Sequence, residues 1–219
     1  MSRIQNRRAV VLVSGADSEI LVAELLTKGW TVLPLYVRCG FQWERTELVR
    51  VRRALKALRH PGLAPLLVAR APMGPLMGGH WSMTGKGVPN AAAAWDSVYL
   101  PGRNMLLLTE AWLHAVAAKA NAVVIGTLKG NPFPDATPEF RAAAQKALNL
   151  GLNANVTIMA PYAKLKKRQV LARAGSFPLR LAFSCLQPVG ARPCGDCSKC
   201  AELSAALKPR ARRSSRAGR

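Results

Sequence analysis

Two hydrophobic patterns alternate along this chain: short apolar runs, and longer segments with apolar residues at helical spacing. The run at 9–13 is typical of a strand buried on both faces of a sheet. Similar runs predict further strands at 31–37, 66–69, 122–126 and 156–159. The segments between them predict helices at 18–28, 43–58, 104–120, 136–150 and 164–174. This order favours an α/β fold with a Rossmann-like, parallel, five-stranded sheet.

The first predicted strand runs into a short loop, Ser14-Gly15-Ala16-Asp17-Ser18, and then into a helix. The unpaired N–H groups and the positive dipole end of a helix N-terminus favour an anion, most often a phosphate. The same residues also fit an ordinary strand-to-helix connection in which Asp17 or Ser18 caps the helix. The loop is therefore a candidate phosphate site, with the plain connection as its alternative.

Two irregular segments interrupt the alternation, at 72–100 and 129–137. The first is rich in proline, glycine, methionine and tryptophan. A structureless segment of this length is typical of a lid or substrate loop, with a plain surface excursion as the alternative. In a parallel sheet the loops that follow the strands meet on one face. The loops at 14–17, 40 and 126–135 should therefore converge and form the active site.

The composition adds a strong positive charge to this picture. The chain has 219 residues, 50% of them hydrophobic, enough for one sizeable core. Its 32 Lys and Arg against 11 Asp and Glu give a net charge of +21, which favours nucleotide phosphates or nucleic acid as ligands. The segment 208–219 carries six of these cations and no acid. We expect it to be a disordered basic tail, either a solvated solubility tail or an RNA-binding arm.

No apolar run is long enough to span a membrane, and the run at 9–13 is too short for a signal peptide. We therefore expect a cytoplasmic protein without membrane contact. The crowding of most cysteines near the C-terminus, in a spacing typical of metal sites, agrees with a reducing compartment.

The four crowded cysteines are Cys185, Cys194, Cys197 and Cys200. Short spacers between thiolates let successive sulfurs reach one tetrahedral ion. Four sulfurs with no open position are typical of structural zinc, with free thiols or an iron–sulfur cluster as alternatives. We therefore divide the chain into an α/β domain at 1–183, a zinc module at 184–207 and the tail. The fifth cysteine, Cys39, is interpreted as a small buried hydrophobe.

Four motifs follow one another in order. They are the loop at 14–18, the string Tyr99-Leu100-Pro101-Gly102-Arg103-Asn104, the stretch from Ile125-Gly126-Thr127 to Phe133-Pro134-Asp135-Ala136-Thr137-Pro138-Glu139-Phe140, and the four cysteines. Together they resemble the 7-cyano-7-deazaguanine synthases of queuosine biosynthesis, which are members of the PP-loop ATP pyrophosphatase group. The resemblance covers about residues 9 to 205 and rests on the combination, since each motif alone is weak.

The resemblance implies an ATP-dependent C–N ligase that uses ATP with Mg²⁺. Such enzymes adenylate the carboxylate of 7-carboxy-7-deazaguanine and let ammonia displace AMP to give the amide. They then activate the amide again, so that it loses water and leaves the nitrile. Adenylation is needed because a carboxylate is a poor electrophile without a good leaving group. The expected partners are the deazaguanine and ammonia, with a homodimer and an RNA contact through the basic tail as further candidates.

The resemblance also implies roles for individual residues. Those expected to bind ATP are Ser14, Gly15, Ala16, Asp17, Ser18 and Gly126. Those expected to be catalytic are Asp17, Ser18 and Arg103. Those expected to hold the deazaguanine are Trp81, Thr84, Arg103, Asn104, Phe133, Asp135 and Glu139. An acidic side chain in that set suits the N–H edge of the base.

Two positions depart from the family pattern. The family loop reads Ser-Gly-Gly-x-Asp-Ser. This loop is one residue shorter and has Ala16 where a second glycine would permit positive φ and a close approach to phosphate. Leu203 stands where an arginine is expected. Three functions therefore remain open: the nitrile-forming synthase, a PP-loop enzyme with another acceptor such as a macromolecule or a tRNA to be thiolated, and a non-catalytic nucleotide- or RNA-binding module.

Overall fold

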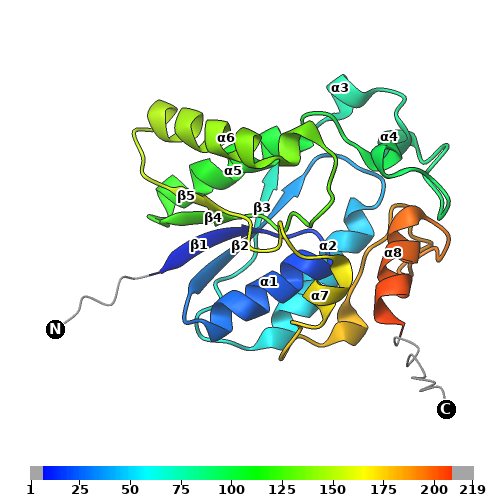
Figure 1. The fold of residues 1–219 in the computed structure, drawn as a ribbon, viewed down its shortest axis with the longest axis horizontal. Coiled ribbons are helices and arrows are strands. Elements are labelled where there is room, and N and C mark those ends of the chain that lie inside the picture. The colour runs from blue at the N-terminus through cyan, green and yellow to red at the C-terminus, as the bar shows by residue number, and fades with distance from the viewer. Residues whose placement is uncertain (1–6, 209–219) are drawn as a thin grey trace, which may run out of the picture.

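The computed structural model describes residues 7–208, so the predicted tail lies, apart from Lys208, outside the described residues. A five-stranded sheet forms its centre, with β1 (Arg8–Leu12), β2 (Thr31–Arg38), β3 (Leu67–Arg70), β4 (Ala122–Val124) and β5 (Thr157–Met159). All neighbouring strands pair in parallel, in the order β3-β2-β1-β4-β5 (Figure 1). The predicted Rossmann-like α/β fold is confirmed.

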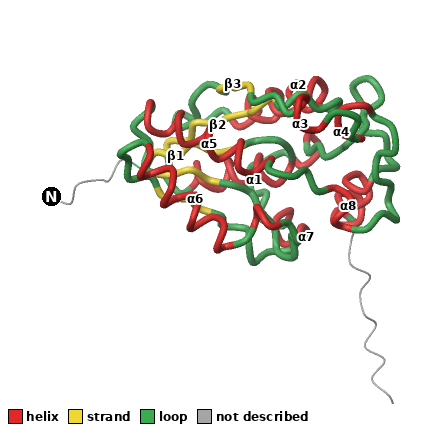
Figure 2. The backbone as a smooth tube through the Cα atoms, turned by 90° about the horizontal axis from the view of Figure 1, so that it is seen from above, coloured by secondary structure: helices red, strands yellow, loops and turns green. Residues whose placement is uncertain are grey.

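Helices cover both faces of this sheet, as Figure 1 and Figure 2 show. One face packs against α1 (Ala16–Thr27), α2 (Glu44–Leu58) and α7 (Lys167–Leu171). The other packs against α5 (Arg103–Ala117) and α6 (Pro138–Gly151). The strand order reverses between β1 and β4, which is where a sheet of this kind opens a crevice for ligands. Among the helices of residues 7–208, none is both long and apolar enough to cross a membrane.

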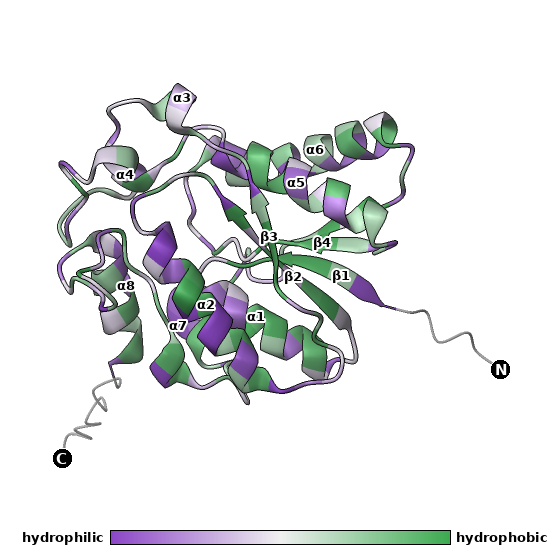
Figure 3. Ribbon diagram, turned by 180° about the vertical axis from the view of Figure 1, so that it is seen from behind, coloured by the Kyte–Doolittle hydropathy of each residue, from purple (hydrophilic) through white to green (hydrophobic). Residues whose placement is uncertain are grey.

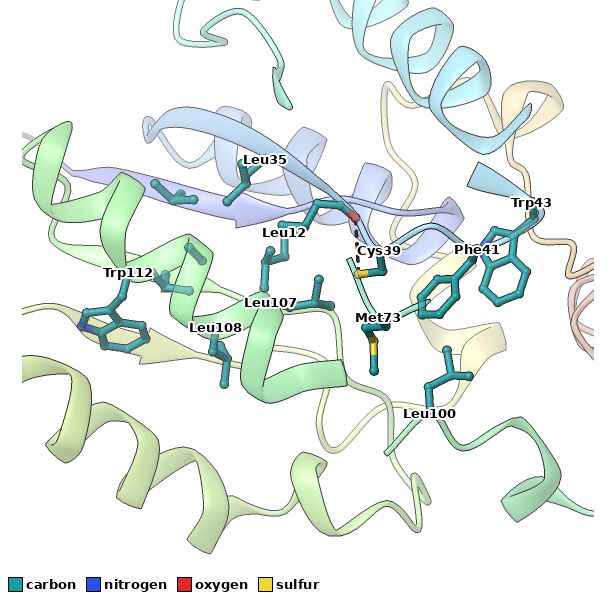
Figure 4. Packing of buried hydrophobic residues seen from close by; sticks show 14 of the residues in the cluster. Leu12, Leu35, Cys39, Phe41, Trp43, Met73, Leu100, Leu107, Leu108 and Trp112 are labelled. Atoms are coloured by element: carbon teal, nitrogen blue, oxygen red, sulfur yellow. Dashed lines mark hydrogen bonds between the residues drawn. The ribbon is translucent and has the colours of Figure 1, made fainter. Parts of the chain in front are cut away.

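Apolar side chains concentrate on the strands and on the helix surfaces that face them (Figure 3). On the α5 face, Trp112 is fully buried beside Leu108 in the core drawn in Figure 4. The indole Nε1 of Trp112 donates a hydrogen bond of 2.9 Å to Oδ1 of Asn149 on α6. Asn149 also bonds both backbone groups of Val156, just before β5. These contacts lock α5, α6 and β5 together and so fix the helix whose first turn reaches the site.

The helix predicted at 164–174 is shorter in the structure, where α7 spans only Lys167–Leu171. The residues before it form a turn instead, because Leu165 donates its backbone N–H to Tyr162 and accepts one from Lys129. Lys166 is extended, and its backbone N–H donates to Oε1 of Gln169 at 2.9 Å. This cap starts the helix at the next residue.

The prediction of a structureless segment at 72–100 is wrong in part. It contains three single-turn helices, α3 (Gly74–Met77), α4 (Trp81–Thr84) and η1 (Trp95–Val98). Its end is fixed on the cysteine module, since Ser198 donates its backbone N–H to Pro89 and Asn90 forms a β-bridge with Cys197. Such tertiary contacts leave no periodic trace in the sequence.

Two 3₁₀ turns complete the chain, η2 (Pro134–Ala136) and η3 (Leu179–Leu181), together with a C-terminal helix, α8 (Ser198–Leu207). The sequence analysis did not predict α8. Its Cys200 is buried, and Leu203 and Ala206 pack against the core on the α1 face. At the position where an arginine was expected, Leu203 therefore makes an apolar contact.

Candidate active site

A cavity of about 260 Å³ opens at the carboxyl ends of β1, β2 and β4. The backbone that follows each of these strands contributes to its wall: the loop at 14–18 after β1, Phe41 after β2, and 125–127 after β4. The predicted convergence of strand ends on one face is thus what the structure shows. The wall is completed by the first turn of α5, by α4 and by the start of the cysteine module.

Most sequence candidates meet in this cavity. Those that line it are Ser14, Gly15, Ala16, Asp17, Ser18, Trp81, Arg103, Asn104, Gly126 and Phe133. The lining does not include Thr84, Asp135 or Glu139. Thr84 is exposed on α4, where its hydroxyl donates to the His80 carbonyl at 3.2 Å, and Glu139 is exposed in the first turn of α6.

Asp135 is buried behind the cavity, where it holds the start of α5. Its Oδ2 accepts the backbone N–H of Asn104 at 3.1 Å, and its Oδ1 accepts from the Asn104 side chain at 3.2 Å. Burial raises the pKa of Asp135, and the hydrogen bonds from Asn104 oppose this rise. Asp135 therefore satisfies a backbone N–H in the first turn of α5, next to Arg103.

The loop after β1 is organised by one hydroxyl. Oγ of Ser18 accepts the backbone N–H groups of Ser14 at 3.0 Å and Gly15 at 3.2 Å, and it donates to the Gly15 carbonyl at 2.8 Å. The backbone N–H of Ala16 donates to the carbonyl of Phe183 at 3.1 Å. Three loop N–H groups therefore already donate within the protein.

Gly15 is required by this close approach. A Cβ built on it would lie 2.9 Å from the Phe183 carbonyl oxygen, closer than real Cβ atoms come to other atoms. Its φ of −172° is ordinary extended backbone, so the need for glycine comes from space. The loop is thus clamped between its own helix and the segment that leads to Cys185.

Three cationic side chains surround the loop. Lys167 of α7, Lys199 of α8 and Arg103 of α5 all line the cavity. Nζ of Lys167 lies 2.7 Å from Oδ2 of Asp17, whereas Oδ1 of Asp17 is buried with no hydrogen-bond partner in the described chain. Burial raises the pKa of Asp17, and the Lys167 charge opposes the rise. The positive charges suit a polyanionic ligand.

Sequence reasoning predicted Trp81 but missed the rest of the opposite wall. It consists of Phe41 and Trp43, whose rings stack with centroids 4.8 Å apart, and Trp81, whose ring lies 5.7 Å from that of Trp43. Glu44 and Glu47, from the first turn of α2, also line the cavity and are almost fully buried. The sequence did contain a signal for these acids. Both lie on the apolar stripe of α2, which faces the core, and a surface helix does not ordinarily place a charge there.

The buried acids are held in different ways. Oε1 of Glu44 accepts the backbone N–H groups of Cys39 and Gly40, which closes the turn after β2. Oε2 of Glu47 accepts the Tyr36 hydroxyl at 2.8 Å. Burial raises the pKa of Glu47 to about 8, and the nearby Arg103 charge opposes the rise. Glu19 of α1 lies fully buried, and burial together with the Glu47 charge raises its pKa to about 8 as well.

The four cysteines of the predicted module come together. Their sulfurs all lie within 4.8 Å of one another, a cluster that could hold a metal ion. Backbone N–H groups of Leu186, Cys194 and Cys197 donate to three of the sulfurs at 3.3–3.4 Å, as suits thiolate ligands. Because Cys185 also lines the cavity, this module forms part of the active-site wall.

Comparison with known proteins shows the family of this chain. The family model described as "Queuosine biosynthesis protein QueC" matches residues 8–210, nearly the whole described chain. The chain belongs to the QueC family. Within this family it is 31% identical over 205 residues to a protein of Acetivibrio thermocellus named 7-cyano-7-deazaguanine synthase, covering 89% of this chain and 90% of that one.

A second QueC relative, from Anaeromyxobacter sp. (strain Fw109-5), has the same name and is 31% identical over 216 residues, covering 91% of each chain. Among solved structures, a predicted subunit of a tRNA methyltransferase from Methanocaldococcus jannaschii overlaps with a TM-score of 0.47 at 14% identity. The overlap covers 77% of this chain and 74% of that one. The QueC match thus spans the phosphate-type loop, the cavity and the four cysteines alike.

Proposed function

We propose that this QueC-family chain is an ATP-dependent 7-cyano-7-deazaguanine synthase, which converts 7-carboxy-7-deazaguanine and ammonia into the nitrile. Both relatives described above carry that name and align over about nine-tenths of the chain. The observation that carries the proposal is the single cavity, which joins the loop at 14–18 to Arg103, Asn104 and an aromatic wall. A reaction between a nucleotide and a flat base needs both held in one place.

We place the ATP phosphates at the loop end of this cavity. Since three loop N–H groups donate within the protein, the side chains of Lys167, Lys199 and Arg103 supply most of the counter-charge, together with the N-terminus of α1. When bound, ATP with Mg²⁺ supplies adenylate as the leaving group, and pyrophosphate departs as the substrate carboxylate takes up AMP. The same cations stabilise the departing charge.

The steps that follow adenylation require that water be excluded from the cavity. Ammonia displaces AMP from the activated carboxylate and loses a proton. The product of this step is the amide. A second ATP then adenylates the amide oxygen. This oxygen leaves with AMP, and loss of the two N–H protons gives the nitrile. Trp43, Leu100 and Leu186 line the cavity from three different segments and shield the activated groups from hydrolysis.

The module's role is proposed to be structural. Cys185, Cys194, Cys197 and Cys200 would hold one Zn²⁺ with no open position, which suits folding and not catalysis. The bound metal would fix the segment from Phe183 to Leu186. Through the Phe183 carbonyl, this segment also fixes the phosphate-type loop.

The test is the mass of the product formed by zinc-loaded protein with 7-carboxy-7-deazaguanine, ammonium, ATP and Mg²⁺. We expect AMP and the nitrile. Asp17→Asn, which keeps the side-chain size but loses the charge that holds Lys167, should lower the rate about 100-fold while circular dichroism stays unchanged. AMP without the nitrile would point to another acceptor, and no AMP at all would favour a binding module.

A further inference from the structure

The aromatic wall contains a buried carboxylate with unused bonding capacity. Glu47 is 8% exposed and lines the cavity. Its Oε2 accepts the Tyr36 hydroxyl, but its Oε1 has no hydrogen-bond partner among residues 7–208. Each oxygen of an ionised carboxylate can accept two hydrogen bonds, so ionised Glu47 offers three free acceptor positions to whatever enters the cavity. Hydrogen bonds donated to these positions by a ligand favour the ionised form.

The surroundings of Glu47 call for hydrogen-bond donors. Glu44 on the same helix adds negative charge beside Glu47, while Arg103 on α5 opposes it. Oε2 of Glu44 is buried without a hydrogen-bond partner among the described residues, at 3.6 Å from Nε of Arg38. Buried acceptors left unpaired destabilise a protein, and a ligand with N–H groups would satisfy them.

The shape of the wall next to Glu47 favours a flat ligand. Phe41 and Trp43 stack with an angle of 19° between their planes, and Trp43 and Trp81 lie at 24°. Figure 4 shows the first two rings side by side, next to Leu100 and Met73. Trp81 covers the second face of Trp43, and the Arg103 guanidinium lies over Phe41 at 5.8 Å from the ring centroid. A planar heteroaromatic ring that enters the cavity therefore meets the edges of these rings, in an edge-to-face contact.

From these contacts we propose that Glu47 recognises the guanine-like edge of the deazaguanine, accepting its ring N–H and its 2-amino group while the base packs against the edges of the Phe41–Trp43 pair. This inference rests on the proposed function and assigns the base to one end of its cavity. It also replaces two sequence candidates: both oxygens of Asp135 already accept hydrogen bonds from Asn104, and Glu139 is exposed outside the cavity lining.

The experiment measures binding and turnover separately. Quenching of tryptophan fluorescence in the zinc-loaded protein, without ATP, gives the affinity for 7-carboxy-7-deazaguanine and for the analogue that lacks the 2-amino group. Steady-state kinetics give the KM values for base and ATP. The variants are Glu47→Gln, which presents one acceptor and one donor where the base needs two acceptors, and Glu110→Gln, the same change on α5 away from the cavity lining.

Glu47→Gln should weaken binding of 7-carboxy-7-deazaguanine about 10- to 100-fold and abolish the preference over the analogue, with the KM for ATP unchanged. Glu110→Gln should behave as wild type. If Glu47→Gln does not fold, Tyr36→Phe tests the same point. It removes the donor that orients Oε2 and should weaken base binding several-fold without changing the KM for ATP.

The inference would be overturned if Glu47→Gln kept the wild-type affinity for the base and the wild-type preference for it over the analogue. A loss of base binding in Glu139→Gln would overturn it as well. Either result would count even if the wild-type protein makes the nitrile. The inference would also be overturned if Glu47→Gln reacted more slowly with ammonium while its affinity for the base stayed unchanged. Conversely, a wild type that makes no nitrile, but whose base binding depends on Glu47, would refute the proposed function and support the inference.

Discussion

The two ends of the active-site cavity differ in how the sequence encodes them. The loop end is one continuous stretch at 14–18, and its shape follows from the strand and helix that it joins. The aromatic end is assembled from the start of α2 and from Trp81 on α4, segments that only the fold brings together. The comparison teaches that local backbone chemistry can be inferred from a motif, whereas a side-chain wall requires the tertiary structure.

The first turn of α2 makes this point at the level of residues. Glu44 and Glu47 would be read as polar positions on a basic surface helix, yet both are buried because that turn faces the cavity. They lie on the same stripe as Val51 and Leu55, which pack on the sheet further along. Buried charge on an apolar stripe is therefore the signal that marks this end of the site.

The largest expected effect comes from removing the metal ligands that support the loop end. Cys197→Ser should abolish binding of one zinc per chain and lower the melting temperature by about 10 °C, or about 3 kcal/mol in a protein of this size. Metal analysis and calorimetry measure both. Cys39→Ser, which changes the buried thiol outside the cluster, should keep the zinc. Full zinc content in Cys197→Ser would show that the cluster is not a four-sulfur site.

A smaller effect is expected where the loop meets this module. Gly15→Ala places a Cβ 2.9 Å from the Phe183 carbonyl oxygen, and the resulting strain should lower the free energy of unfolding by about 1–3 kcal/mol. Gly151→Ala, near the end of α6 with open space around it, is the matched control and should be neutral or slightly stabilising. Chemical denaturation compares the two. Equal stability of both variants would mean that the loop is not clamped as described.

The smallest effect concerns the acidic end and depends on pH. Glu19 has a folded-state pKa raised from 4.5 to about 8, so its stabilising contribution is present below its unfolded pKa and is lost as the pH rises through about 8. Glu19→Gln should therefore stabilise the protein by about 1–2 kcal/mol above that pH and change little in mild acid. Denaturation at several pH values checks this, and a variant destabilised equally at every pH would contradict the assignment.

Much of the fold follows from the sequence because its strands are short apolar runs between helical patterns. The positions of β1, β2 and β4 need only this alternation, whereas the order of the strands in the sheet comes from the structure. The four cysteines were likewise predictable, since their spacing alone limits the chemistry. What could not be predicted depends on remote partners: α8 is stabilised by Leu203 against the core, and 72–100 is held by a bridge to the cysteine module.

The site shows the same division. The loop at 14–18 and the pair Arg103 and Asn104 lie at the cavity as predicted, because they follow directly from strand and helix ends. Asp135, which was predicted to hold the base, accepts a hydrogen bond from Asn104 on α5, a contact between residues 31 positions apart that the sequence did not indicate. Lys167 was missed because a lone lysine on a helix has no distinctive spacing. Glu47 was missed although it lies on the apolar stripe of α2.

A structure of the protein with 7-carboxy-7-deazaguanine and a non-hydrolysable ATP analogue tests the central claim most directly, that one cavity holds nucleotide and base at opposite ends. The account predicts the phosphates at the loop 14–18 beside Lys167, and the base ring against the edges of the Phe41–Trp43 pair with its amino edge at Glu47. A base bound away from that wall, or phosphates away from the loop, would contradict it.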